Sequence, residues 1–164
     1  MLEAVGALRS RAADASELAG HADAVAGHVE VWQMLELRVF LPFYLTTTGA
    51  LLAAAGDADG AWQRYEESLQ LGAQTGMRFY DAETMRRLAH LAPDRDAVIA
   101  ALRAALDLAR TQAARPFELR IALDLHDLLG AEACPLLERA IGAFNGRDAT
   151  SELEDARARM LIPR

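Results

Sequence analysis

Residues 45–72 of the chain read LTTTGALLAAAGDADGAWQRYEESLQLG, and this segment is the most informative about the fold. Its apolar and small residues recur at helical spacing on both sides of a Gly-Asp pair, where a glycine ends one helix and an acid can cap the next. Within the stretch, Gly49 is followed by Ala61, Tyr65 and Ser68 at offsets of 12, 16 and 19 residues. Helices joined by so short a turn pack as antiparallel neighbours, and small residues at their contact allow a close approach. The sequence therefore predicts a helical hairpin here.

These offsets match those of a tetratricopeptide (TPR) repeat. Such a repeat is a helix pair with a small residue where its helices meet and small–aromatic–small spacing along the second helix. The next unit is degenerate, because Ala89 replaces the glycine and the turn must shorten for Val98, Leu102 and Ala105 to keep a small–large–small order. A third unit, over 117–144, has a tighter turn still. We therefore expect TPR-like packing and not a uniform array.

Glycine, proline and asparagine divide the whole chain into segments of helix length. We predict helices over 2–19, 21–34, 36–55, 59–74, 79–92, 95–113, 116–129 and 131–144, with a short ninth over 151–161. No Ser/Gly- or Pro-rich linker separates them, so we expect a single domain over residues 1–164. The predicted fold is all-α: a TPR-like antiparallel helical-repeat array, or α-solenoid, of about eight or nine helices.

Capping residues are expected at several of these boundaries. Asp59 and Asp94 can cap the helices that follow them, and Ser151 with Glu154 has the spacing of a capping box. Gly76 is expected to close a helix in the left-handed conformation, which glycine adopts without steric penalty.

The composition excludes several classes of protein. Alanine, leucine, arginine and glutamate dominate, which favours helices over strands. A formal net charge of −7 disfavours direct binding of nucleic acid, which needs clustered basic residues. The single cysteine, Cys134, cannot form an intramolecular disulfide and fits a cytoplasmic protein. The N-terminus is not a secretory signal, and the uncharged stretch 39–56 contains Pro42 and a threonine run, so we expect no membrane span.

Five short segments carry a family resemblance. They are Leu41-Pro42-Phe43-Tyr44-Leu45, Thr75-Gly76-Met77-Arg78-Phe79-Tyr80-Asp81-Ala82-Glu83, Arg115-Pro116-Phe117-Glu118-Leu119-Arg120, Ala133-Cys134-Pro135-Leu136-Leu137 and Leu153-Glu154-Asp155-Ala156. From about Gly27 to the C-terminus, and in this order, the chain resembles the C-terminal TPR-like region of large bacterial ATPase regulators of the adenylate-cyclase-like and LuxR-type family. The resemblance implies a sensor or scaffold region of a signalling protein or transcriptional regulator.

Other parts of those regulators have no counterpart in this sequence. There is no G-x-x-x-x-G-K-[ST] loop to bind phosphates, so no ATPase activity is carried over. A cyclase segment and a helix-turn-helix reader are likewise not recognisable. If the chain is an entire gene product, the resemblance implies a detached tail or a partner that acts in trans.

One polar set is the best candidate for a binding site. Glu83, Arg86 and His90 recur at i, i+3 and i+7, so they share one helix face, which the repeat alignment places on the concave groove. Arg86 and His90 could hold a carboxylate or a peptide backbone. The other members of the predicted partner-binding face are Phe43, Thr46 and Arg120. In the alternative interpretation, Glu83 or Glu118 pairs with an arginine only to fix adjacent helices.

Candidate catalytic and metal-binding groups are weaker. His21 and His28 lie seven residues apart, about 10 Å along a helix, which is too far to chelate one metal ion. His126 could pair with Cys134 as a nucleophile, but a small thiol before a proline in an Ala/Leu-rich helix is ordinarily a buried apolar residue. We expect no catalytic residue, no metal and no cofactor. Trp62 is expected in the core together with the tyrosine that follows it by one helical turn.

We therefore expect a non-catalytic module that binds a protein or peptide, as a regulatory or sensor part of a bacterial signalling or transcription-regulator system. A small-ligand sensor stays open and would need an apolar cavity near Phe40, Phe43 and Tyr44. An all-α enzyme is the remaining alternative. Homo-oligomerisation stays open too, because a repeat array has two ends that expose apolar surface unless they are capped. The charged final helix resembles such a cap, whereas the N-terminal helix has Leu2, Val5 and Leu8 on one side.

Overall fold

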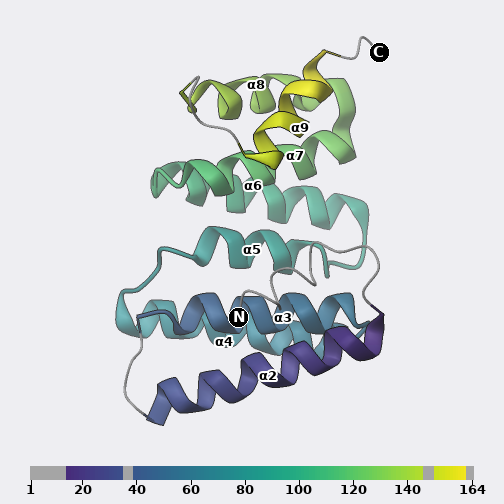
Figure 1. The fold of residues 1–164 in the computed structure, drawn as a ribbon. Helices are drawn as coiled ribbons and strands as arrows, with labels where there is room; N and C mark the ends of the chain where they lie inside the picture. The colour runs from purple at the N-terminus through teal and green to yellow at the C-terminus, as the bar shows by residue number, and fades with distance from the viewer. Residues whose placement is uncertain (1–13, 35–38, 146–149, 162–164) are drawn as a thin grey trace. The chain divides into compact units, whose positions relative to one another are not determined.

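A computed structural model describes residues 14–34, 39–145 and 150–161 of the chain. Within these ranges the backbone is almost entirely helical and forms no β-strand, which confirms the all-α class (Figure 1). Among the described helices, none combines the length and the apolar character needed to cross a membrane. The class is therefore established, while the repeat array and its count of eight or nine helices are not confirmed.

The chain divides into two compact units, residues 1–91 (unit 1) and residues 92–164 (unit 2), and each is described by itself. The described helices of unit 1 are α2 (Ala15–Met34), α3 (Leu41–Ala54), α4 (Ala58–Thr75) and α5 (Asp81–Ala89). Those of unit 2 are α6 (Arg95–Thr111), α7 (Arg115–Leu129), the 3₁₀ helix η1 (Gly130–Ala133), α8 (Cys134–Gly142) and α9 (Ser151–Met160). Within a unit, helices that follow one another pack together; α3 also contacts α5, and α7 also contacts α9. The single domain expected over 1–164 stays a prediction.

Helix α2 runs unbroken through Gly20, so the predicted break between helices over 2–19 and 21–34 is wrong. Gly20 is exposed, and nothing lies within 4 Å of where its Cβ would be. The helix tolerates this glycine because packing of its other face outweighs local propensity. The buried residues of that face are Leu18, Ala22, Val25 and Val29, which pack with α3. Most of the helix predicted over 2–19, with Leu2, Val5 and Leu8, lies outside the described residues.

Side-chain caps are present at the starts of α4, α6 and α9. Two of the predicted capping residues are wrong, and one is confirmed. Asp94 caps α6 as predicted and accepts a backbone N–H at 2.8 Å. Helix α4 is capped by Asp57 and not by Asp59, and α9 by Thr150 and not by Ser151. In each case the side-chain oxygen accepts the N–H three residues further on, so the cap is the residue directly before the first helical one. The glycine that closes α4 has the expected left-handed φ, 74°.

The predicted close contact between α3 and α4 is present. A Cβ on Gly49 would lie 2.6 Å from Cε1 of Tyr65 and 3.1 Å from the backbone oxygen of Ala61, so the helices meet where only glycine fits. Tyr65 and Ser68 are at most 1 % exposed. The expected core position of Trp62 is wrong, because its side chain is 46 % exposed. Trp62 follows Ala61 and is therefore turned about 100° around the helix from the residue that meets α3.

Unit 2 is built around an apolar core. Its buried residues on α7, α8 and α9 are Leu119, Ala122, Leu123, Leu137, Ala140, Leu153 and Ala156. The apolar face predicted along α6 is buried at Leu102, Ala105, Leu106 and Ala109, and only partly buried at Val98. Since α6, α8 and α9 all contact α7, this helix is the centre of the unit.

Candidate partner-binding surface

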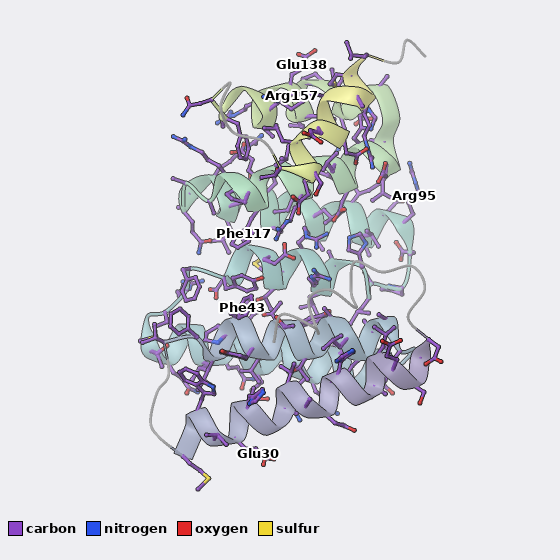
Figure 2. All side chains as sticks on the ribbon, in the orientation of Figure 1. Glu30, Phe43, Arg95, Phe117, Glu138 and Arg157 are labelled. Carbon is purple, nitrogen blue, oxygen red and sulfur yellow. The ribbon has the colours of Figure 1, made fainter. Side chains whose placement is uncertain are left out.

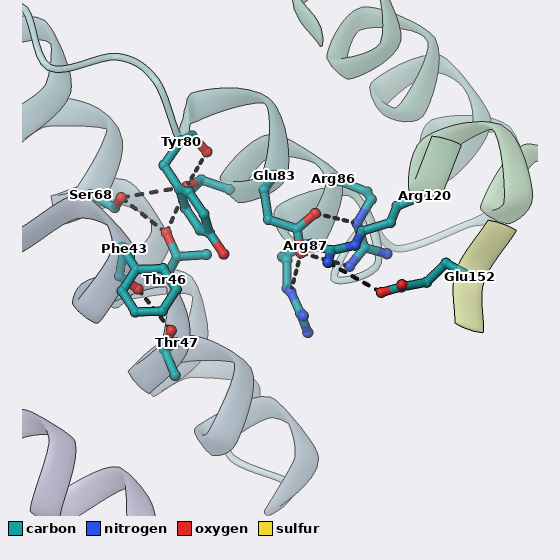
Figure 3. A network of polar contacts seen from close by, with 11 residues as sticks. Phe43, Thr46, Thr47, Ser68, Tyr80, Glu83, Arg86, Arg87, Arg120 and Glu152 are labelled. Carbon is teal, nitrogen blue, oxygen red and sulfur yellow. Dashed lines mark hydrogen bonds and ion pairs between the residues drawn. The ribbon is translucent and has the colours of Figure 1, made fainter. Parts of the chain in front are cut away.

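Glu83, the first of the predicted site residues, is buried on α5 with 0 % exposure. Its carboxylate accepts hydrogen bonds from Nε of Arg86 at 2.8 Å, from Nη2 of Arg86 at 2.9 Å and from Nε of Arg87 at 2.9 Å (Figure 3). A buried carboxylate is stable only when it is paired and hydrogen-bonded in this way. Glu83 therefore fixes the two arginines of its own helix, and its own part in partner binding stays a prediction.

The other predicted residues of α5 are more accessible. The side chain of Arg86 is 12 % exposed and that of Arg87 is 32 % exposed. His90 is exposed at the C-cap of α5, because the helix predicted over 79–92 ends at Ala89. Among the ionisable residues of this face, exposure thus rises from Glu83 through Arg86 to His90. A partner-binding role for Arg86 and His90 stays a prediction.

Thr46 is buried in a cluster of hydroxyl groups that joins three helices. Its Oγ1 lies 2.6 Å from Oγ1 of Thr84 on α5 and 3.1 Å from Oγ of Ser68 on α4. Ser68 in turn donates to the backbone oxygen of Pro42 at 3.0 Å. Side chains that are buried and bonded to one another hold the helices together, so Thr46 is buried in a contact between helices.

Arg120, the last predicted site residue, belongs to unit 2. Its Nη2 lies 3.2 Å from Oε1 of Glu152, which links α7 to α9, and its guanidinium carbon lies 5.8 Å from the centroid of the Phe117 ring. Since the other five predicted residues are in unit 1, the structure does not describe the six as one site.

Unit 1 carries an aromatic row that sequence reasoning did not identify as a site. The rings of Trp32 and Tyr44 are stacked with centroids 5.6 Å apart, and Tyr44 meets Phe43 edge-on at 5.6 Å. Phe43 meets Tyr80 edge-on at 5.2 Å, and Tyr80 meets Phe79 at 6.0 Å. The row joins the end of α2, the start of α3 and the two residues before α5. Its members are far apart in the sequence, so no local spacing reveals it.

Large apolar side chains flank the row and are exposed. Phe79, in the row itself, is 48 % exposed, and Phe40, the residue before α3, is 53 % exposed. Val39, next to Phe40, is 50 % exposed, and Val31 and Met34, on α2 beside Trp32 in the chain, are 51 % and 83 % exposed. Exposed apolar side chains gathered around packed aromatics are typical of an interaction surface. The aromatic row and these flanks are therefore the best candidate site in the described residues.

Tyr65 on α4 interacts electrostatically with the charged residues of α5. Burial raises the pKa of Tyr65 to about 12, the positive charges of Arg87 and Arg86 lower it, and the charge of Glu83 raises it. A phenol whose pKa lies so high stays neutral at physiological pH and acts as a packing residue. The α3–α4 contact and the arginine pair are thus coupled.

The groups considered for catalysis or metal binding do not converge. His126 is 3 % exposed on α7, and its Nδ1 has no hydrogen-bond partner among the described residues. Cys134 is half-buried at the start of α8, and no hydrogen bond joins it to His126 in the described ranges. His21 lies 3.8 Å from Glu17 of its own helix. No group of three or more metal-ligating side chains was found in the part of the chain that the structure describes.

One pocket of unit 1 bears on the small-ligand alternative. It has a volume of about 270 Å³, lies between α2, α3 and the start of α4, and is lined by Asp23, Asp57, Gln63 and Arg64 over a floor of small and apolar residues. It is not the apolar cavity near Phe40, Phe43 and Tyr44 that this alternative called for. The pocket is polar and placed elsewhere in the unit.

No protein-family model, no curated protein and no solved structure matches the chain. The resemblance to the TPR-like region of bacterial ATPase regulators therefore stays a prediction, and function has to be inferred from the geometry of the residues.

Proposed function

We propose that this chain is a non-catalytic helical-repeat module that binds a protein or peptide through the aromatic row and its apolar flanks. The observation that carries the proposal is the row itself, in which five rings touch in sequence from Trp32 to Phe79. Aromatic side chains bury large areas at low conformational cost and are enriched among the residues that dominate binding energy. A row that ends in an exposed ring offers such contacts to a partner.

The arrangement of α3, α4 and α5 supports the repeat part of this proposal. Glycine stands at both helix junctions: a Cβ on Gly49 would collide with Tyr65, and a Cβ on Gly72 would lie 2.7 Å from Oδ1 of Asp81. If α3 and α4 form one repeat, α3 and α5 are the first helices of consecutive repeats. First helices line the partner-binding face of TPR arrays. Phe43 lies on α3, and Tyr80 directly precedes α5.

The residues around the row define the class of partner. The side chain of Arg78 is 59 % exposed next to Phe79, and His90 is exposed at the far end of α5. Arginine binds carboxylates through paired N–H groups. A peptide with apolar anchors for the rings and an acidic group for the exposed Arg78, whose Nε also lies 2.8 Å from Oδ2 of Asp81, would fit best, and its recognition would serve a regulatory role.

A peptide-display selection against the immobilised full chain tests this function. The variant to compare carries Phe40→Ala and Phe79→Ala, since both rings are about half exposed and their loss leaves the core intact. The matched control is Trp62→Ala, which removes an aromatic of similar exposure, 46 %, outside the row. Peptides selected on wild type should bind the control unchanged and the double variant at least about thirtyfold more weakly. Equal binding to both variants, or no enrichment over a blank support, would overturn the proposal.

A small-ligand sensor is the second candidate, favoured by the polar pocket beside the start of α4. Its charged lining of Asp23, Asp57 and Arg64 would suit a small molecule that carries both charges. A thermal-shift screen with amino acids and other small zwitterions tests it. A shift that is lost in Asp23→Ala would support a sensor, and no shift with any member would remove it.

A further inference from the structure

Unit 2 carries an open groove between α8 and α9. It has a volume of about 450 Å³ and is lined by Glu138, Ile141, Gly142, Arg157, Met160 and Leu161. Ile141 and Met160 pack against the unit's core with one side, and Leu161 is 81 % exposed. The final helix, which the sequence predicts to be a polar cap, therefore leaves apolar surface uncovered within the described residues.

The two charged residues that line the groove, unlike the arginines near them in the chain, have no ion-pair partner among the described residues. Figure 2 labels Glu138 on α8 and Arg157 on α9, and both line the groove. Neither makes an ion pair or a side-chain hydrogen bond with any residue in 14–34, 39–145 or 150–161. The next arginines along each helix are paired: Arg139 lies 3.7 Å from Glu118, and Arg159 lies 2.9 Å from Asp155. An acid on one helix and a base on the other thus flank an apolar floor without pairing within the chain.

We propose that this groove is a self-association surface, which a second copy of the chain occupies around a twofold axis. A twofold interface places the same patch on both sides, so the patch must be complementary to itself. An acid and a base on opposite sides of an apolar strip satisfy this condition: Glu138 of each copy faces Arg157 of the other. The exposed Leu161 side chains are buried at the same time, together with Met160.

The size of the groove sets the strength of the contact. Stable complexes use roughly 20–30 residues from each partner, and far fewer line this groove. The dimer is therefore weak and forms with rising concentration, with a dissociation constant on the order of 100 µM. This inference concerns unit 2 alone and does not depend on the peptide-binding surface of unit 1.

Sedimentation velocity on the full chain, from low to high micromolar concentration, tests the inference through a charge swap. Wild type should shift from monomer to dimer. Glu138→Arg and Arg157→Glu should each weaken association roughly tenfold, because each places like charges at both symmetry-related contacts. The double variant should recover the wild-type constant. An equimolar mixture of the two single variants should form heterodimers, since opposite charges then meet at both contacts.

Two further variants separate this surface from general effects. Leu161→Glu replaces an exposed apolar residue, so it should abolish association while circular dichroism stays unchanged. Arg103→Glu makes the same charge change as Arg157→Glu at an exposed pair elsewhere in unit 2, 3.4 Å from Glu132, and should leave association unchanged. A wild-type chain that stays monomeric at every concentration would overturn the inference. So would single reversals without effect, or a double variant that does not recover.

Discussion

The two units use opposite means to hold their helices together. Of the buried polar or charged residues in the described part of the chain, seven lie in unit 1 and one, His126, lies in unit 2. Unit 1 joins α3, α4 and α5 through buried hydroxyls and glycine contacts, and α5 pairs its buried carboxylate with its own arginines. Unit 2 packs leucine against alanine and keeps ion pairs such as Arg120–Glu152 partly exposed.

This difference has a consequence for specificity. Buried polar groups are costly unless every partner is in place, so they permit few alternative arrangements of the helices. Apolar cores accept substitutions of similar volume more readily. Unit 1 should therefore respond sharply to small chemical changes, and its aromatic row includes two rings on α3 and two directly before α5, which are among the helices fixed in this way.

The largest effect should follow from Glu83→Ala. The change leaves Arg86 and Arg87 beside a buried space and should lower the free energy of unfolding by about 3–5 kcal/mol. Urea unfolding followed by circular dichroism measures the loss. Glu152→Ala is the matched control in unit 2, where the carboxylate is 31 % exposed, and should cost at most about 1 kcal/mol. Similar losses in both variants would contradict the contrast between the units.

Raising the pH should weaken unit 1 through Tyr65. Its pKa rises from 10.0 to about 12 in the folded chain, so the unfolded chain ionises first. The contribution of Tyr65 to the free energy of unfolding is complete below pH 10 and is lost as the pH approaches 12. The loss should reach about 3 kcal/mol at most. The chain contains no lysine, which leaves few other side chains that change charge in this range. Tyr65→Phe should flatten the pH dependence of urea unfolding, and an unchanged slope would contradict the assignment.

These effects also mark what the sequence could and could not predict. The contact between Gly49 and Tyr65 was predictable, because a TPR pair fixes the spacing of small and aromatic residues along two joined helices. The burial of Glu83 was not, since a charged residue is buried only when partners such as Arg86 and Arg87 complete its hydrogen bonds, and spacing alone does not distinguish this from a surface pair. The aromatic row was not predictable either, because its rings come from segments that are far apart in the sequence.

Two glycine substitutions in unit 1 should have effects of intermediate size and opposite sign. Gly49→Ala places a methyl group against the Tyr65 ring and should cost about 1–3 kcal/mol. Gly20→Ala meets nothing within 4 Å and should stabilise α2 by up to about 1 kcal/mol, because alanine is the better helix former. Thermal unfolding of both variants measures the difference. If Gly49→Ala stabilised the chain as Gly20→Ala is expected to, helix propensity would outweigh packing at Gly49.

The smallest effect is expected at the surface of unit 2. Arg120→Ala removes a partly exposed ion pair with Glu152 and should change the free energy of unfolding by at most about 1 kcal/mol. High salt should reduce even this difference, because screening weakens exposed pairs. A loss as large as that of Glu83→Ala would mean that Arg120 has a structural role of the kind assigned to unit 1.

Binding through the aromatic row is tested most directly with the two tryptophans of the chain as internal reporters. Trp32 stacks on Tyr44 in the aromatic row, whereas Trp62 is exposed on α4 outside it. A peptide obtained by display selection is titrated into the ¹⁵N-labelled full chain, and the two indole N–H signals are followed by NMR. Binding through the aromatic row predicts that the Trp32 signal shifts and saturates while the Trp62 signal stays in place. A shift confined to Trp62, or saturable binding that moves neither signal, would contradict it.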